Sequence, residues 1–180
     1  MGSFCILKGV RKIMSNKQTN DGAGVKGFFR LNVVDHAEDG STKVVGDSGW
    51  KENLVTNLGF QHFVIEPMGA IAGSSTVGSF ALGTGTEPGA TATSLDAELS
   101  DAAGCRFALT PSVVSSKTLQ MVGTLASNIV TANRTIKNVG IFGVSTTAVG
   151  SMLAGNTFAT SQLQTNQSVN VTYQLRFATA

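Results

Sequence analysis

Charged residues are scarce in this chain of 180 residues, because Asp, Glu, Lys and Arg together make up only 13% of it. Soluble domains usually contain about 25%. Hydrophobic residues make up 42%, which argues against a disordered chain, since such chains combine high charge with low hydrophobicity. The length and the 21 glycines indicate a single β-rich domain whose neutral surfaces are partly covered by neighbours.

Residues that carry chemistry are also few. Cys5 and Cys105 lie far apart without a CxxC spacing, which argues against a disulfide framework or a zinc site, and we expect Cys105 to be a small core residue. His36 lies in an acidic turn, where we expect it to be solvated, and His62 is expected to serve packing. No carboxylate follows Asp101. We therefore predict no catalytic, cofactor-binding or metal site, and a protein that is not an enzyme.

Long apolar runs are missing as well. No segment approaches the roughly 20 apolar residues of a membrane-spanning helix, so we predict no membrane partner. In "MGSFCILKGV" the charges follow the apolar patch rather than precede it, unlike a signal peptide. Because "MSNKQ", from Met14, reads as a natural protein start, residues 1–13 are expected to be either an upstream extension or a flexible arm.

The charges that are present are unevenly distributed. Residues 1–30 carry a net charge of +5 and the remainder carries −3. We therefore predict a flexible basic N-terminal arm over residues 1–24 and one domain over residues 25–180. The arm is either a solvated tail or a contact with an acidic surface. A nucleic-acid partner is disfavoured, because the body is acidic and its aromatics fall on the apolar side of strands. The residues predicted to contact a partner are Lys8, Arg11, Lys12 and Lys17.

Period-two alternation dominates the body and predicts strands. It is clearest from Val169 to Phe177, where apolar residues face one way and Asn, Thr, Gln and Arg face the other. Residues 15–26 are interpreted as a linker, and Asn57 as the cap of a helix through residue 66. Trp50 and Phe60 are expected to be core anchors. Further strands are predicted around residues 29–33, 43–45, 50–55, 79–83, 118–130, 136–144 and 152–158. The pattern predicts an all-β fold, mainly an antiparallel β-sandwich or jelly roll with one or two short helices.

Two glycine-rich stretches resemble nucleotide-binding loops. "GAGVKG" matches G-x-G-x-x-G as a string, but a polar linker precedes it and a strand follows, whereas a dinucleotide site needs a strand before and a helix after. In "GTGTEPG" no Lys follows, and Glu87 would repel a phosphate. We interpret it as a bend before a short helix, "LDAEL", capped by Ser94, with Asp96 and Glu98 complementing the helix dipole.

Five segments resemble, in their order and spacing, a recurring pattern of tailed-bacteriophage virion proteins. They are "NLVTNLGFQHF" after Trp50, "ALGTGTEPGATATSLDAEL", "NRTIKNVGIFGV", "GSMLAGNTF" and "SVNVTYQLRF", within residues 49–178. The resemblance implies a structural component made in the host bacterial cytoplasm and located in the virion: a capsid decoration protein, a head fibre, or a tail or baseplate element. It also implies a homo-oligomer, with a trimer favoured, that contacts the major capsid protein or another virion protein.

The chain departs from this pattern at two places. Asn138 and Val139 replace a usual acidic residue, and Gly155 and Asn156 replace a usual Arg or Lys, as if a charge pair between adjacent strands had been lost together. Two alternatives to a purely structural role remain. A receptor- or glycan-binding module would need an exposed aromatic cluster in a loop, and a small hydrolase would need a pocket of convergent titratable groups.

Overall fold

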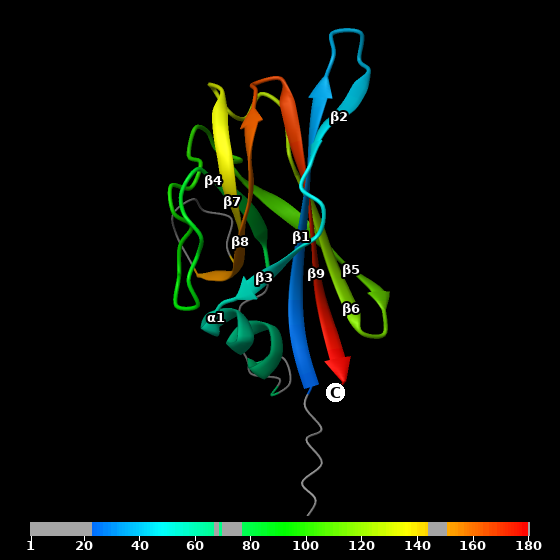
Figure 1. Ribbon diagram of the computed structural model, residues 1–180, viewed down its shortest axis with the longest axis vertical. Helices are drawn as coiled ribbons and strands as arrows, with labels where there is room; N and C mark the ends of the chain where they lie inside the picture. Colours follow the sequence, from blue (N-terminus) through cyan, green and yellow to red (C-terminus); the bar gives the residue numbers. More distant parts are fainter. Residues whose placement is uncertain (1–22, 67–68, 70–76, 144–150, 180) are drawn as a thin grey trace, which may run out of the picture.

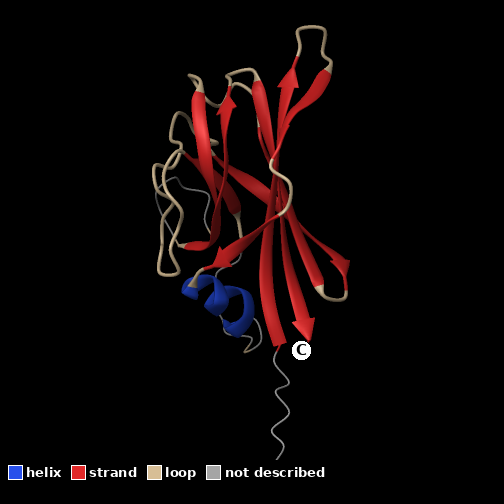
Figure 2. Ribbon diagram, in the orientation of Figure 1, coloured by secondary structure: helices blue, strands red, loops and turns tan. Residues whose placement is uncertain are grey.

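The protein is an all-β structure, as the sequence predicts. The computed structural model describes residues 23–66, 69, 77–143 and 151–179, and within these ranges nine strands accompany one short helical segment (Figures 1 and 2). The strands are β1 (Ala23–His36), β2 (Thr42–Asp47), β3 (Lys51–Val55), β4 (Ser79–Gly83), β5 (Arg106–Ser115), β6 (Thr118–Leu125), β7 (Arg134–Phe142), β8 (Met152–Leu163) and β9 (Gln167–Thr179).

Eight of these strands close into an antiparallel barrel. Their order is β1-β3-β8-β7-β4-β5-β6-β9, and β9 pairs again with β1. The β1–β9 ladder runs from Ala23 opposite Thr179 to Asp35 opposite Gln167, so the two ends of the described chain form the longest pairing. On its other edge β1 pairs with β3 in its first half and with β2 in its second half. The closed ladder establishes the antiparallel fold, and a division into two sandwich sheets is not needed to describe it.

The predicted alternation of β9 is confirmed over most of the strand. Val169, Val171, Tyr173 and Leu175 are at most 1% exposed, whereas Phe177, beyond them, is 40% exposed. Tyr173 packs against Phe29 with ring centroids 4.7 Å apart, and burial raises the pKa of its hydroxyl. The inward face of β9 therefore forms part of the barrel core.

The helical segment consists of a single α-helical turn, α1 (Asn57–Phe60), followed by a π-helical turn, η1 (Gln61–Ile65). Its cap is Thr56 and not Asn57, because the Thr56 hydroxyl oxygen accepts a hydrogen bond from the Gly59 N–H at 3.0 Å. Gly59 lies so close to β8 that a Cβ there would be 1.9 Å from the Leu153 carbonyl oxygen. The turn is thus pressed directly onto the backbone of β8.

Several boundary predictions need correction. β1 begins at Ala23, inside the predicted linker, and β6 ends at Leu125 rather than Val130. The whole of β5 was missed by the sequence interpretation. Phe60 is 42% exposed, so its predicted role as a core anchor is wrong. Cys105 is buried and is a free thiol, as predicted.

Candidate functional site

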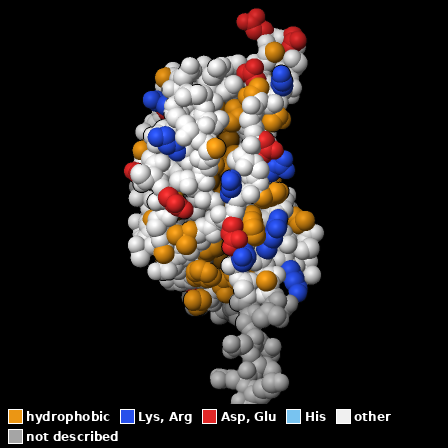
Figure 3. Space-filling view, in the orientation of Figure 1, with side chains coloured by type: hydrophobic (Ala, Val, Ile, Leu, Met, Phe, Trp, Pro, Cys, Tyr) orange, Lys and Arg blue, Asp and Glu red, His pale blue; other side chains and the backbone are white. Residues whose placement is uncertain are grey.

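The outer face of β3, β1, β9 and β6 carries an exposed group of aromatic and cationic side chains. Phe28 lies opposite both Glu52 and Gln174, and Gln174 lies opposite Gln120, so these side chains form one row across the four strands. In the next row Arg176 lies opposite Lys26. Figure 3 shows hydrophobic side chains interspersed with Lys and Arg along this part of the molecule.

On this face Arg176 stacks on two aromatic rings. Its guanidinium carbon is 4.3 Å from the Phe28 ring centroid and 5.6 Å from the Trp50 ring centroid. These distances are within the range of cation–π attraction. We call Phe28, Trp50 and Arg176 the aromatic–cation cluster.

Arg176 is held in this position by its neighbours on the sheet. Its Nε and Nη2 donate hydrogen bonds to the Gln174 side-chain oxygen at 3.0 and 2.6 Å. The Gln174 amide nitrogen in turn donates to Gln120 Oε1 at 2.8 Å. The guanidinium orientation is therefore set by a hydrogen-bonded row rather than left to rotate in solvent.

Trp50 is 40% exposed, so the prediction that it is a core anchor is wrong. It lies in the short connection between β2 and β3. Both strands pair with the same edge of β1, β2 with its second half and β3 with its first half. The connection passes across the outside of the barrel in Figure 1. The sequence interpretation missed this position because a Trp beside an apolar strand is usually buried.

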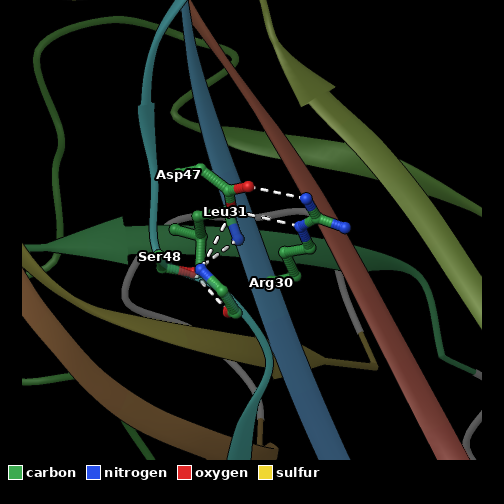
Figure 4. A network of polar contacts seen from close by, with 5 residues as sticks. Arg30, Leu31, Asp47 and Ser48 are labelled. Atoms are coloured by element: carbon green, nitrogen blue, oxygen red, sulfur yellow. Dashed lines mark hydrogen bonds and ion pairs between the residues drawn. The ribbon is translucent and has the colours of Figure 1, made fainter.

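A polar network fixes the connection that carries Trp50 (Figure 4). Arg30 donates to both carboxylate oxygens of Asp47, at 3.1 and 2.6 Å, and so links the outer face of β1 to the end of β2. Ser48 binds the Leu31 backbone twice, through its N–H and through its hydroxyl oxygen, each at 2.9 Å. The connection is thereby held against the middle of β1.

Asp47 also shapes the turn that follows it. Its Oδ1 accepts the Gly49 N–H at 2.9 Å, and Gly49 has φ of 63°, a left-handed conformation that glycine adopts at little cost. The hydrogen bonds from Arg30 and then from Gly49 lower the pKa of Asp47 to about 2. The carboxylate is therefore ionised, and its bonds are kept, throughout the neutral pH range.

The rest of the outer face is nearly neutral. Lys26 pairs with Glu52 at 3.0 Å, which cancels one positive charge next to the cluster. Further along, Thr124 donates to Asn170 at 2.7 Å beside Thr172 and Val122. These residues line a shallow depression formed by small and polar side chains. A partner can bury such a surface at a lower desolvation cost than a charged one.

The hydrogen-bond donors of Thr86, in the "GTGTEPG" loop, are already bound by Asp96 from the turn that follows. Asp96 Oδ2 accepts hydrogen bonds from the Thr86 N–H at 2.7 Å and from the Thr86 hydroxyl at 2.8 Å. A Cβ on Gly85 would lie 2.4 Å from the Asp96 carboxylate, so this glycine is required by close approach. A carboxylate thus takes the backbone donor that a phosphate would need, which supports the structural interpretation of the loop.

The predicted helix over "LDAEL" is not formed. Ala97 has φ of 48°, a left-handed conformation that interrupts a helix, and Leu95 and Leu99 on either side are both buried. Ser94 therefore caps nothing helical. Glu98, assigned to the helix dipole by the sequence, instead receives bonds from Arg106 Nε at 2.6 Å and Nη2 at 2.9 Å.

Glu98 and Asp101 each form an ion pair with an arginine. The side chains of Arg106 and Glu98 are only 1% and 5% exposed, and the Arg106 guanidinium lies 3.7 Å from the Phe142 ring centroid. Asp101 pairs with Arg134, and this pairing lowers the pKa of Asp101. Both pairs border an open polar depression next to Thr84 and Thr131. With their carboxylates already bound to guanidinium groups, they are poorly suited to act as a general base.

His62 and Glu66 form a separate pair on the helical segment. His62 Nδ1 is 2.6 Å from Glu66 Oε2, and the other Glu66 oxygen accepts from Gln61 at 2.7 Å. Both side chains are largely buried. The predicted packing role of His62 thus includes a hydrogen bond. His36 contacts Ser168 Oγ at 2.8 Å and is half-buried, in place of the solvated side chain predicted.

The two departures from the phage pattern lie on adjacent strands, as predicted. Val139 is directly opposite Asn156, and Gly140 is opposite Gly155. Asn138 is fully buried and donates to the Thr86 and Asp96 carbonyls. Asn156 donates to the Glu52 carbonyl at 2.8 Å. Uncharged amides thus serve backbone bonding at these strand positions.

The predicted partner contacts Lys8, Arg11, Lys12 and Lys17 lie outside the described residues. Within the described ranges, no group of three or more His, Cys, Asp or Glu is arranged to hold a metal ion. No helix among those residues is long and apolar enough to cross a membrane.

Comparison with known proteins finds no matching family model, no matching curated protein and no matching solved structure.

Proposed function

We propose that the protein is a non-enzymatic structural component of a bacteriophage virion, such as a capsid decoration or head-fibre protein. It acts by burying its neutral outer surfaces against copies of itself and against other virion proteins, such as the major capsid protein. The observation that carries this proposal is the aromatic–cation cluster on the outer face of the barrel. Trp, Phe and Arg are the residues enriched at the centres of protein interfaces.

A second exposed apolar area supports the same interpretation. Leu54, Phe60 and Ile65 are 40%, 42% and 60% exposed, and they belong to β3 and the helical segment that follows it. Hydrophobic side chains gather at the lower left of Figure 3, where this segment lies. Exposed apolar side chains here as well as in the cluster fit a subunit that has more than one neighbour, as in a cyclic trimer or on a capsid lattice.

Several carboxylates of the described residues are already bound by other side chains and are poor candidates for a general base. Glu98 and Asp101 are held by arginines, Asp96 is held by Thr86, and Glu66 is held by His62 and Gln61.

A sandwich-like flattening of the barrel, with β1, β9 and β6 on one side, would present this outer face as a flat contact surface. The N-terminal basic residues Lys8, Arg11, Lys12 and Lys17 would then add contacts to an acidic neighbour.

Quantitative mass spectrometry of purified particles of the phage that encodes the chain tests this proposal. A decoration protein is expected at a copy number close to that of the major capsid protein, and a tail element at a few copies. Peptides from the chain should remain with the particles through a density gradient. If they stay with the soluble host proteins instead, the chain is not a virion component and the proposal is wrong.

A second function, receptor or glycan binding at a tail or fibre tip, is favoured by one observation. Trp50 is exposed in a loop beside Phe28, which is the kind of aromatic group that stacks on sugar rings. Because Trp50 is the only tryptophan, its fluorescence reports on this place alone. Titration with bacterial surface oligosaccharides should shift or quench the emission if the glycan function is right. An unchanged emission across the set would argue against it.

A further inference from the structure

Two exposed acidic side chains lie at one end of the molecule. Glu38 and Asp39 lie at the tip of the β1–β2 hairpin, which projects beyond the barrel at the top of Figures 1 and 3. Asp39 Oδ1 accepts the Ser41 N–H at 2.9 Å, and hydrogen bonding by the Ser41 side chain and then by this N–H lowers the pKa of Asp39. Just behind the tip, Val44 and Val45 are 56% and 50% exposed. The tip therefore combines exposed carboxylates with exposed apolar side chains.

The aromatic–cation cluster has complementary chemistry. Nε and Nη2 of Arg176 are used by Gln174, while Nη1 makes no hydrogen bond to the described residues. This leaves an exposed donor edge on a guanidinium whose orientation is already set by Phe28 and Gln174. A guanidinium held in this way loses little entropy when it binds a carboxylate.

We infer that the aromatic–cation cluster of one copy binds the acidic β1–β2 hairpin tip of a second copy. Arg176 would pair with Glu38 or Asp39, and Val44 or Val45 would contact Trp50. The inference rests on the proposed function, since it names the surfaces through which copies of the chain associate. The basic N-terminal segment is a poor occupant of the cluster, because its net positive charge opposes that of Arg176.

The two surfaces of one copy cannot meet each other. Lys26, which lies opposite Arg176, and His36, next to the tip, are separated along β1 by about 33 Å at ~3.3 Å per residue. The contact must therefore join different copies head to tail. Such a heterologous contact produces a closed ring, of which a trimer is one case, or an open fibre.

Charge exchange tests the contact in the full chain. Sedimentation velocity over a concentration series gives the association constant of the wild type, of Arg176→Glu and of the double variant Glu38→Lys with Asp39→Lys. Each variant should weaken association by at least about 10-fold, because like charges would then face each other. Combining all three substitutions should restore most of the loss. Trp50 emission should shift to shorter wavelength as wild-type association proceeds and should not shift in Arg176→Glu.

Matched controls are Lys137→Glu on the exposed side of β7 and Glu87→Lys in an exposed loop, which make charge changes of the same kind elsewhere. Both should associate like the wild type. If the wild type associates but Arg176→Glu does so equally well, or if the combined variant regains nothing, the inference is wrong while self-association stands. If the wild type remains monomeric up to high micromolar concentration, the inference fails together with the self-association on which it rests.

Discussion

Arg106 donates two hydrogen bonds to Glu98, at 2.6 and 2.9 Å, and both side chains are almost completely excluded from solvent. The pair joins the start of β5 to the turn that follows the "GTGTEPG" loop. A buried ion pair therefore fixes the end of the glycine-containing stretch that resembles a ligand site. Glu98, which the sequence assigns to a helix dipole, is instead part of a buried pair that holds the fold.

Breaking this pair should be costly. We expect Glu98→Ala to lower the free energy of unfolding by about 3–5 kcal/mol, because it leaves the Arg106 charge buried without its carboxylate. Urea denaturation measures the change. Glu87→Ala, an exposed acid in the preceding loop, should change it by less than about 0.5 kcal/mol. Equal effects for the two variants would contradict the assigned role of the pair.

The Arg30–Asp47 contact should make stability depend on acid. The folded-state pKa of Asp47, about 2, is below its ordinary value, so its contribution is present above about pH 4 and is lost as pH falls toward 2. Asp96 and Asp101, whose pKa values are also lowered, act in the same direction. The melting temperature should therefore fall from pH 5 to pH 2, and less steeply in Asp47→Asn. A slope that the substitution leaves unchanged would rule out this contribution.

Gly59 offers a test of how the helical segment is seated. A Cβ at this position would overlap the Leu153 carbonyl, whereas a Cβ on Gly89 would meet nothing within 4 Å. Gly59→Ala should destabilise the protein by roughly 1–3 kcal/mol or more, as overpacking does. Gly89→Ala should be close to neutral. Thermal unfolding of the two variants side by side makes the comparison, and a neutral Gly59→Ala would mean that the segment is not pressed onto β8.

Trp50 should be dispensable for folding. Because it lies on the outer surface, we expect Trp50→Ala to cost at most about 1 kcal/mol, the range of a surface cation–π contact. Phe80→Ala in the core, where Phe80 is fully buried, should cost about 3–5 kcal/mol. Denaturation followed by circular dichroism distinguishes them. A large loss of stability in Trp50→Ala would show that Trp50 is a core residue, as the sequence predicts, and would contradict its position on the outer surface.

The sequence predicts the strands whose two faces differ in solvation, because alternation records that difference directly. β9 shows this best, with Val171 and Tyr173 inward and Thr172 and Gln174 outward. β5 was missed because most of it, from Thr110 onward, is exposed on both faces and therefore shows no alternation. The helix predicted around Asp96 failed because its side chain bonds to Thr86, a contact set by the fold and not by local propensity.

Closure of the barrel and the position of the cluster depend on long-range pairing. Ala23 is paired with Thr179, nearly the full described length away, and no local pattern specifies such a register. Phe28 and Arg176 come from opposite ends of the chain, and Trp50 reaches them only because Asp47 and Ser48 hold its loop on β1. A binding surface assembled from three distant segments leaves no motif in the sequence.

Hydroxyl-radical footprinting of Trp50 on purified virus particles tests the central claim most directly, since that claim is that the outer face works by being covered. The account predicts that Trp50 is oxidised readily in the isolated monomer and is protected in the assembled particle. Oxidation at the same rate in both states would show that the outer face stays uncovered, and it would contradict the account.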